Sequence, residues 1–340
     1  MRRRLPAAVA VLLLGAVLIP AVAPLAQGRP KVRYVRPFAP DVSIAWYYVA
    51  LDKGYFRDAG IDTEIVVGTV GSGGALQQVI AGSGEFASGP PDAMLNAVGQ
   101  GEALVGFWQW IKLGIFGIQA RKDRGITRVE DLKGKTIGVL GMASATRYAP
   151  LMMLARAGLK ESDVNMVVLG GGGAAYGPAL ERGQVDALGT WDVPKWVVET
   201  TAGDAAFRSG LVYLPAVDYL PDIFTTTRKY YDAHKDDLVK FLVAMQRANA
   251  DVARDIDAAV AITAKYLPAV KSADPAVMRK TVEIRSASLS PDGRFDYAAY
   301  ERALPLYREL GLVKGDPQAF KLREILSNEL PDRVQKQLAR

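Results

Sequence analysis

The chain has 340 residues, of which 50% are hydrophobic and 23% are charged, so it is long enough for two domains and its composition excludes a disordered protein. It contains no cysteine and one histidine, which excludes disulfides, thiolate metal sites and cysteine nucleophiles and disfavours a serine–histidine triad. The formal net charge falls from +6 to +3 without the three arginines at positions 2–4, so no nucleic-acid partner is indicated.

Residues 1–26 have the order of a secretory signal peptide. Three arginines at positions 2–4 precede an apolar run that ends in small residues, and cleavage is predicted after Ala26. A retained membrane anchor is the alternative, but Pro20 and Pro24 favour processing because they break the helix there. Without a cysteine there is no site for a lipid anchor, so we expect a periplasmic protein. Sec and twin-arginine export both stay open.

The next part of the chain alternates strands and helices. The patterns predict, in order, a strand at 31–38, a helix at 43–60, a strand at 62–68, a helix at 75–84 and a strand at 85–89. About 100 residues later the same order recurs, with strands at 135–141, 164–170 and 184–191 and helices at 144–158 and 174–183. The sequence therefore predicts two lobes with the same order of strands and helices.

Alternation of strands and helices implies right-handed crossovers, so the fold class is α/β, with a mostly parallel sheet flanked by helices in each lobe. Extended segments at 106–125 and 209–231 connect the lobes, and helical patterns from Asp236 onward are expected to complete the first lobe. The predicted division gives residues 30–121 and 218–340 to lobe 1 and residues 122–217 to lobe 2. Ligands are expected in the cleft between the lobes, at the carboxyl ends of the strands.

Polar residues at the predicted helix starts are the first candidates for ligand contacts. Helix N-termini present unpaired N–H groups and a partial positive charge, which favours anions. An arginine at such an end adds charge-assisted hydrogen bonds to a carboxylate or sulfonate. The alternative is that Asp41 and Ser144 only cap helices and that Arg147 points into water. The candidates are Asp41, Ser72, Gly73, Ser88, Ser144, Thr146 and Arg147.

Aromatic residues near the strand ends are the second group of candidates. Trp46, Trp110 and Trp191 lie close to the predicted cleft, although a single tryptophan is more often a core residue. Trp191 is the best of them because it ends a predicted strand and Asp192 follows it.

The segment 167–177, VVLGGGGAAYG, also allows a nucleotide site. Gly170, Gly172 and Ala175 have the relaxed G-x-G-x-x-A spacing of a dinucleotide-binding turn, and Asp192 lies 22 residues after Gly170, near the distance expected for a ribose-binding acid. However, the segment 68–76 forms a matching glycine loop in the other half. A pair of such loops suits a small ligand held from both sides better than one dinucleotide.

Several motifs resemble the ABC-importer periplasmic substrate-binding proteins of the nitrate, sulfonate, taurine and thiamine-pyrimidine (NMT1/THI5-like) group. The resemblance covers residues 32–245 and is carried by WYYVALDKGYFRDAGIDTEIV, GSGGALQQVIAGSGEFASG, VEDLKGKTIGVL, LERGQVDAL and WDVP. It implies a type II periplasmic-binding-protein fold that closes on a solute. It also implies delivery to a membrane permease and its ATPase, with no catalysis and no cofactor.

Position by position, the resemblance places the ligand near residues 41–46, Ser72, Ser88, Ser144 and Trp191. Thiamine-pyrimidine members tend to carry histidine, alanine, proline and an aromatic residue where this chain has residues 44–47, IAWY, which disfavours their ligand. We expect a monomer that binds a sulfonate, a carboxylate or a heteroaromatic solute such as a pyrimidine-type compound. The alternatives are an exported NAD(P)-binding oxidoreductase that uses the Gly170 loop and a ligand sensor for a membrane receptor.

Overall fold

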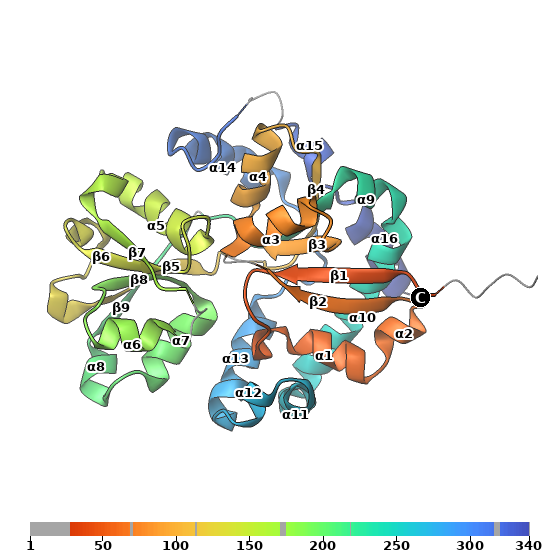
Figure 1. Ribbon diagram of the computed structural model, residues 1–340, viewed down its shortest axis with the longest axis horizontal. Coiled ribbons are helices and arrows are strands. Elements are labelled where there is room, and N and C mark those ends of the chain that lie inside the picture. Colours follow the sequence, from red (N-terminus) through yellow and green to blue (C-terminus); the bar gives the residue numbers. More distant parts are fainter. Residues whose placement is uncertain are drawn as a thin grey trace, which may run out of the picture.

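The computed structural model describes residues 28–68, 71–112, 114–170, 175–217, 219–315 and 320–339. Figure 1 shows two lobes, each built around its own sheet. The sheet of the first lobe has the order β2-β1-β3-β10-β4 and consists of β1 (Lys31–Arg36), β2 (Asp62–Val67), β3 (Phe86–Gly89), β4 (Leu104–Gln109) and β10 (Ile223–Thr227). The sheet of the second has the order β7-β6-β8-β5-β9 and consists of β5 (Phe116–Arg121), β6 (Thr136–Val139), β7 (Asn165–Val168), β8 (Ala187–Trp191) and β9 (Leu211–Pro215).

The two sheets share one topology. The first three strands in each order pair in parallel, and the fourth strand, β10 or β5, pairs antiparallel with both of its neighbours. Helices cover both faces, which explains why β4 and β8 are apolar runs rather than alternating patterns. The predicted α/β class and the two similar lobes are confirmed.

Helices from both ends of the described chain surround the first sheet. Figure 1 shows α3 and α4 on one side of it and α1 and α10 on the other. The amino-terminal helices are η1 (Val42–Ile44), α1 (Ala45–Asp52), α2 (Tyr55–Asp58), α3 (Gly71–Ile80) and α4 (Pro91–Gly99). The carboxyl-terminal helices are α9 (Arg228–Ala233), α10 (Lys235–Arg254), α11 (Ile256–Tyr266), α12 (Pro268–Lys271), α13 (Pro275–Ser288), α14 (Tyr297–Glu309), α15 (Leu322–Ile325) and α16 (Glu329–Leu338).

The second sheet is flanked by shorter helices, with α5 on one side and α6, α7 and α8 on the other (Figure 1). These elements are η2 (Lys122–Arg124), η3 (Val129–Leu132), α5 (Ala145–Arg156), η4 (Glu161–Asp163), α6 (Tyr176–Glu181), α7 (Asp192–Thr201) and α8 (Ala205–Ser209). None of the helices in the described part of the chain is long and apolar enough to cross a bilayer. The predicted signal peptide lies outside the described residues.

Two details differ from the sequence prediction. The helix expected at 43–60 is divided into η1, α1 and α2: Ile44 leaves the helical conformation between η1 and α1, and Gly54 adopts a left-handed φ of 76° between α1 and α2. Residues 116–121, expected at the end of lobe 1, form β5 in the second sheet, where they pair antiparallel with β8 and β9. We therefore propose that the chain first crosses between the lobes at residues 110–115, and that it returns between β9 and β10 close to the expected boundary.

Candidate functional site

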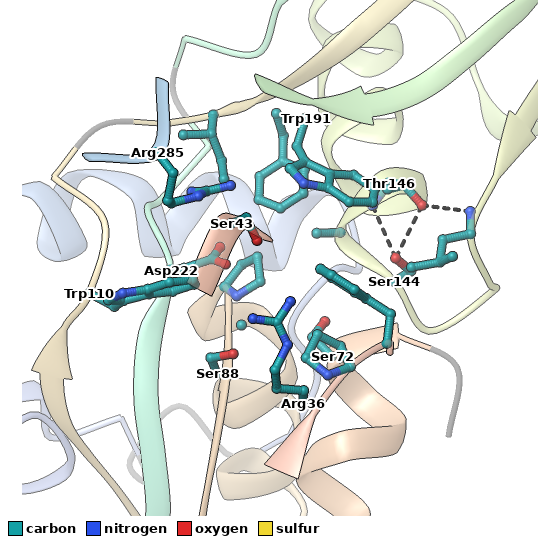
Figure 2. A pocket seen from close by; sticks show the side chains of 18 residues that line it. Arg36, Ser43, Ser72, Ser88, Trp110, Ser144, Thr146, Trp191, Asp222 and Arg285 are labelled. Carbon is teal, nitrogen blue, oxygen red and sulfur yellow. Dashed lines mark hydrogen bonds between the residues drawn. The ribbon is translucent and has the colours of Figure 1, made fainter. Parts of the chain in front are cut away.

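A pocket of about 540 Å³ lies between the two lobes. Its wall comes from the carboxyl ends of strands, from helix starts, from both crossing segments and from α13 (Figure 2). The residues that line it are Arg36, Pro37, Phe38, Ser43, Ser72, Ser88, Gly89, Pro90, Trp110, Ile115, Phe116, Leu140, Ser144, Ala145, Thr146, Trp191, Asp222 and Arg285. We call this space the inner pocket. Its position agrees with the cleft expected for two α/β lobes.

Arg36 lies at the carboxyl end of β1 and is 1% exposed. Its Nη2 lies 3.7 Å from Oδ1 of Asp41, while Nε and Nη1 are buried and have no hydrogen-bond partner among the described residues. The guanidinium also lies over the ring of Phe38, 4.7 Å from its centroid. A buried arginine with two unused donor atoms is costly for a protein to keep unless a ligand pairs with it.

Asp222 and Arg285 complete the polar part of the inner pocket. Asp222 precedes β10 on the returning segment, and its Oδ1 is buried without a partner in the described structure. Arg285 in α13 is 4% exposed, donates from Nη2 to Oδ1 of Asp192 at 2.9 Å and lies over the ring of Trp110. Its Nε has no partner within the described residues. Three chain segments that are far apart in sequence thus bring two cations and a carboxyl group together.

Burial raises the pKa of Asp222 to about 7, because the charged form loses hydration in this environment. The positive charge of Arg285 opposes this rise, whereas Asp192 and Asp92 add to it. At neutral pH the carboxyl group of Asp222 is therefore close to half ionised. A ligand that favours one protonation state changes the charge of the pocket when it binds.

The remaining wall of the inner pocket is largely aromatic. Phe38 from the first lobe and Trp191 at the end of β8 in the second face each other, with ring centroids 5.5 Å apart. Trp110 stacks on Phe224 at 5.7 Å, and Phe116 lies at the start of β5. Such surfaces suit a flat organic body that packs against rings from both lobes.

The hydroxyl groups around the pocket differ in whether they already form hydrogen bonds within the protein. Ser144 caps α5, and Thr146 Oγ1 accepts a hydrogen bond from the N–H of Leu140 at 2.8 Å. Ser88 shares a 2.7 Å hydrogen bond with the hydroxyl of Tyr34. In contrast, Ser72 Oγ is buried and has no partner in the described part of the chain. Of the four predicted hydroxyls, Ser72 is the one best placed to bind a ligand.

Six of the predicted site residues line the inner pocket: Ser72, Ser88, Trp110, Ser144, Thr146 and Trp191. Asp192 lies just behind it and holds Arg285. Asp41 caps η1, where its Oδ1 accepts from the N–H of Ser43 at 3.0 Å. Ligand contact by each of these residues stays a prediction.

The structure places other predicted residues away from the inner pocket. Trp46 is a core residue of α1, 2% exposed, with its ring edge-on to Phe241. Arg147 points to another side of the lobe boundary, where its guanidinium pairs with both carboxylate oxygens of Glu161. Gly73 lines that same side. Gly172 lies outside the described residues.

The residues that sequence reasoning missed are Arg36, Phe38, Asp222 and Arg285. The position of Arg36 near the carboxyl end of a predicted strand was a usable signal, because strand ends form the cleft. Arg285 gave no such signal, since α13 is a polar helix in which arginines are common. Its role depends on the tertiary position of the helix.

Three contacts join the lobes around the pocket. The N–H of Gly73 donates to the carbonyl of Ala143 at 3.2 Å, and Arg285 pairs with Asp192. Phe38 and Trp191 form the third contact. The structure therefore represents a closed arrangement of the lobes.

A second space, of about 970 Å³, opens on the other side of Phe38 and Trp191 and is mainly apolar. The described residues contain no group of three or more side chains arranged to hold a metal ion. Gly170 has a φ of 63°, and it does not line the inner pocket.

The comparisons with known proteins agree with this geometry. A family model described as NMT1/THI5 like matches residues 41–259, more than half of the chain. The chain belongs to this family. The riboflavin-binding protein RibY of Chloroflexus aurantiacus is 30% identical to this NMT1/THI5-like chain over 160 residues, which is 44% of each protein. The match therefore spans less than half the length of that relative.

Solved structures share the fold over nearly the whole chain. A Bordetella bronchiseptica protein is 25% identical, with a TM-score of 0.74 over 92% of this chain and 99% of its own. The alkanesulfonate-binding protein SsuA from Xanthomonas axonopodis pv. citri, solved with bound MOPS, is 18% identical, with a TM-score of 0.67 over 89% and 99%. The desulfurization enzyme DSZB is 17% identical, with a TM-score of 0.56 over 91% and 100%. The periplasmic-binding-protein fold predicted for this chain is thus confirmed, in a group of mostly solute-binding proteins.

Proposed function

We propose that this protein is the solute-binding component of an ABC importer. In the periplasm it captures a small organic solute between its two lobes and delivers it to a membrane permease with its ATPase. The observation that carries the proposal is the inner pocket, in which buried polar atoms of Arg36, Asp222 and Arg285 have no partner among the described residues. Unpaired buried groups cost free energy, which a bound solute would recover.

The mechanism follows from the position of the contacts between the lobes. The solute binds to Arg36, Asp222 and the first-lobe wall, and Trp191 of the second lobe then closes over it. The solute stabilises the closed form because only that form contacts it from both sides. The permease recognises the closed form.

The solute classes considered are sulfonates, carboxylates and heteroaromatic compounds. RibY, by its name, binds riboflavin, and SsuA binds alkanesulfonates, so the relatives support both an aromatic and an anionic ligand. The aromatic wall of this pocket fits a heteroaromatic body, and its two arginines fit acceptor oxygens.

A thermal-shift screen tests the proposal. Riboflavin, alkanesulfonates, aromatic carboxylates, pyrimidines and NAD are added one by one to the mature protein. One organic solute should raise the melting temperature, since a ligand at 100 times its Kd stabilises the folded state by about 2.7 kcal/mol. The solute should be recovered unchanged after denaturation of the complex. Stabilisation by NAD alone, or conversion of the solute, would contradict the proposal and favour an enzyme.

A further inference from the structure

The polar end of the inner pocket has an unusual order of hydrogen-bonding groups. Figure 2 shows the carboxyl group of Asp222 between the guanidinium groups of Arg36 and Arg285. Nε and Nη1 of Arg36, Oδ1 of Asp222 and Nε of Arg285 are all buried and have no partner within the described chain. Across the polar end of the pocket, Arg36 therefore offers a donor, Asp222 an acceptor and Arg285 a second donor.

This order discriminates between the possible head groups of the solute. A sulfonate or carboxylate presents acceptors alone, so it would face the lone pairs and the negative charge of Asp222. An ammonium group presents donors alone, so it would face two guanidinium groups. A head group that matches all three residues must present an acceptor, a donor and an acceptor in sequence.

The shape of the pocket adds a second requirement. Trp110 lies under Arg285 and beside Phe224, and Phe38 lies under Arg36. Both cations are therefore backed by aromatic rings, which leaves their remaining N–H groups for in-plane hydrogen bonds. A flat ring whose edge carries the polar atoms fits between these surfaces.

We propose that the inner pocket selects the edge of a planar cyclic imide, such as a pyrimidinedione ring, whose two carbonyls accept from Arg36 and Arg285 and whose N–H donates to Asp222. The inference rests on the proposed function and names the head group of the solute. An aromatic extension of the same ring contacts Phe38 and Trp191.

The proposal fixes the sign of the pH dependence. The ionisable groups that surround Asp222 are Arg36, Arg285, Asp192, Asp92, Tyr34, Tyr219 and Tyr300. Because the pKa of Asp222 is about 7, the carboxylate that accepts the imide N–H is the minor form at pH 6 and the major form at pH 8. Affinity for an imide should therefore rise by about tenfold from pH 6 to pH 8. An anionic head group would show the opposite trend.

Lumichrome and two methylated analogues test the proposal by calorimetric titration. Methylation of the imide nitrogen N3 removes the donor and leaves the buried carboxylate unpaired, so affinity should fall about 10- to 100-fold. Methylation at N1 adds the same volume and keeps the imide edge, so its effect should be much smaller. Equal losses for the two analogues would overturn the assignment of the N–H to Asp222.

A pair of variants separates recognition from folding. Asp222→Asn removes the charge and should weaken lumichrome binding about tenfold at pH 8 and abolish the pH trend. Asp92→Asn is the matched control, because Asp92 is an equally buried carboxyl group that does not line the pocket. It should leave the affinity at pH 8 nearly unchanged and, because the charge of Asp92 raises the pKa of Asp222, move the pH trend to lower pH without abolishing it. If Asp222→Asn does not fold, the comparison of the two methylated analogues on the wild-type protein still tests whether the imide N–H donates to Asp222.

The outcomes also separate this inference from the proposed function. Absence of lumichrome binding overturns the imide assignment. Tight binding of an alkanesulfonate, with affinity that rises as the pH falls, overturns it as well but keeps the solute-binding function. If no solute of the thermal-shift panel is bound, both proposals fail.

Discussion

At the scale of single residues, the pocket holds groups that folding alone would not favour. Buried arginine and aspartate side chains are usually fully paired, yet Arg36 and Asp222 keep unpaired atoms in the described structure. A carboxyl group in a cleft with a raised pKa, as Asp222 has, is a known mark of binding sites, and so is a buried charged group without a partner. These two residues therefore identify the site more strongly than the serines at the helix starts.

Trp191 should report solute binding by its fluorescence. It lines the pocket and contacts Phe38 of the other lobe, so a solute in the pocket must change its surroundings. Trp191→Ala should reduce the solute-induced change in emission, leaving the part that comes from Trp110, and should weaken binding about tenfold, because an aromatic surface is lost. Trp46→Phe is the control, since Trp46 is a core residue, and it should keep the response. A full response in Trp191→Ala would contradict the placement of the solute.

Asp92 should make stability depend on pH. Burial raises its pKa to about 7, whereas an unfolded aspartate titrates near its ordinary value of about 3.9. Between these values the folded protein keeps a proton that the unfolded chain releases, so the contribution of Asp92 to the free energy of unfolding falls as the pH rises. Asp92→Asn removes this penalty, which is on the order of 4 kcal/mol at pH 8.

Denaturant unfolding of the wild type and Asp92→Asn at pH 4 and pH 8 measures this effect. The two proteins should be closest in stability at pH 4, and the variant should be the more stable at pH 8. A constant difference across this range would show that Asp92 has the same pKa in the folded and the unfolded protein, which would contradict the raised pKa.

At the scale of elements, helix α13 connects the solute pocket with the closure of the two lobes. It belongs to the first lobe, packs against η1 and α7, and carries Arg285, which pairs with Asp192 of the second lobe. In an open form the charges of Arg285 and Asp192 would both be hydrated. The ion pair therefore stabilises the closed arrangement of the lobes more than it stabilises the folded state against unfolding. Asp192→Asn should therefore weaken solute binding about tenfold and leave the melting temperature without solute nearly unchanged.

The control for this variant is Asp257→Asn, which removes the partner of Arg279 in an exposed pair within the first lobe. Titration of the Asp257→Asn variant with the solute should give the wild-type Kd. If Asp192→Asn lowers the melting temperature without solute but keeps the Kd, the pair is structural.

Elements were easier to predict than the site. The order of strands and helices followed from local periodicity, and the glycines that end helices marked most boundaries. The sheet membership of β5 was missed because pairing is decided by tertiary contacts rather than by its apolar sequence. Arg285 was missed for the same reason: its partner Asp192 lies 93 residues away. Ser72, Ser88 and Trp191 were predicted to lie near the cleft because strand ends and helix starts form it, and they line the inner pocket, whereas their contact with a solute stays a prediction.

At the scale of the whole molecule, the two lobes are joined by two chain segments, so they can move relative to each other as units. The chain contains no cysteine, and a Cβ added at Gly73 would lie 3.1 Å from Cβ of Ala143 on the other lobe. This separation is slightly below the usual range for a disulfide, and a small rotation of the lobes would meet it.

The double variant Gly73→Cys with Ala143→Cys should therefore form a disulfide that holds the lobes closed. In the oxidised form, solute should enter and leave at least tenfold more slowly in stopped-flow fluorescence, and reduction should restore the wild-type rates. The single-cysteine variants are the controls. Unchanged exchange in a protein shown to be cross-linked would contradict hinge closure.

The order of the strands along the chain has a consequence for synthesis. β4 pairs in its sheet with β10, which is made more than 110 residues later, whereas β5 to β9 follow one another without interruption. The first sheet thus stays incomplete until residue 227 has left the ribosome, while the second has all of its strands by residue 215. During synthesis the second sheet can therefore be completed before the first, and the amino-terminal strands reach their final pairing only after the whole second sheet has been made.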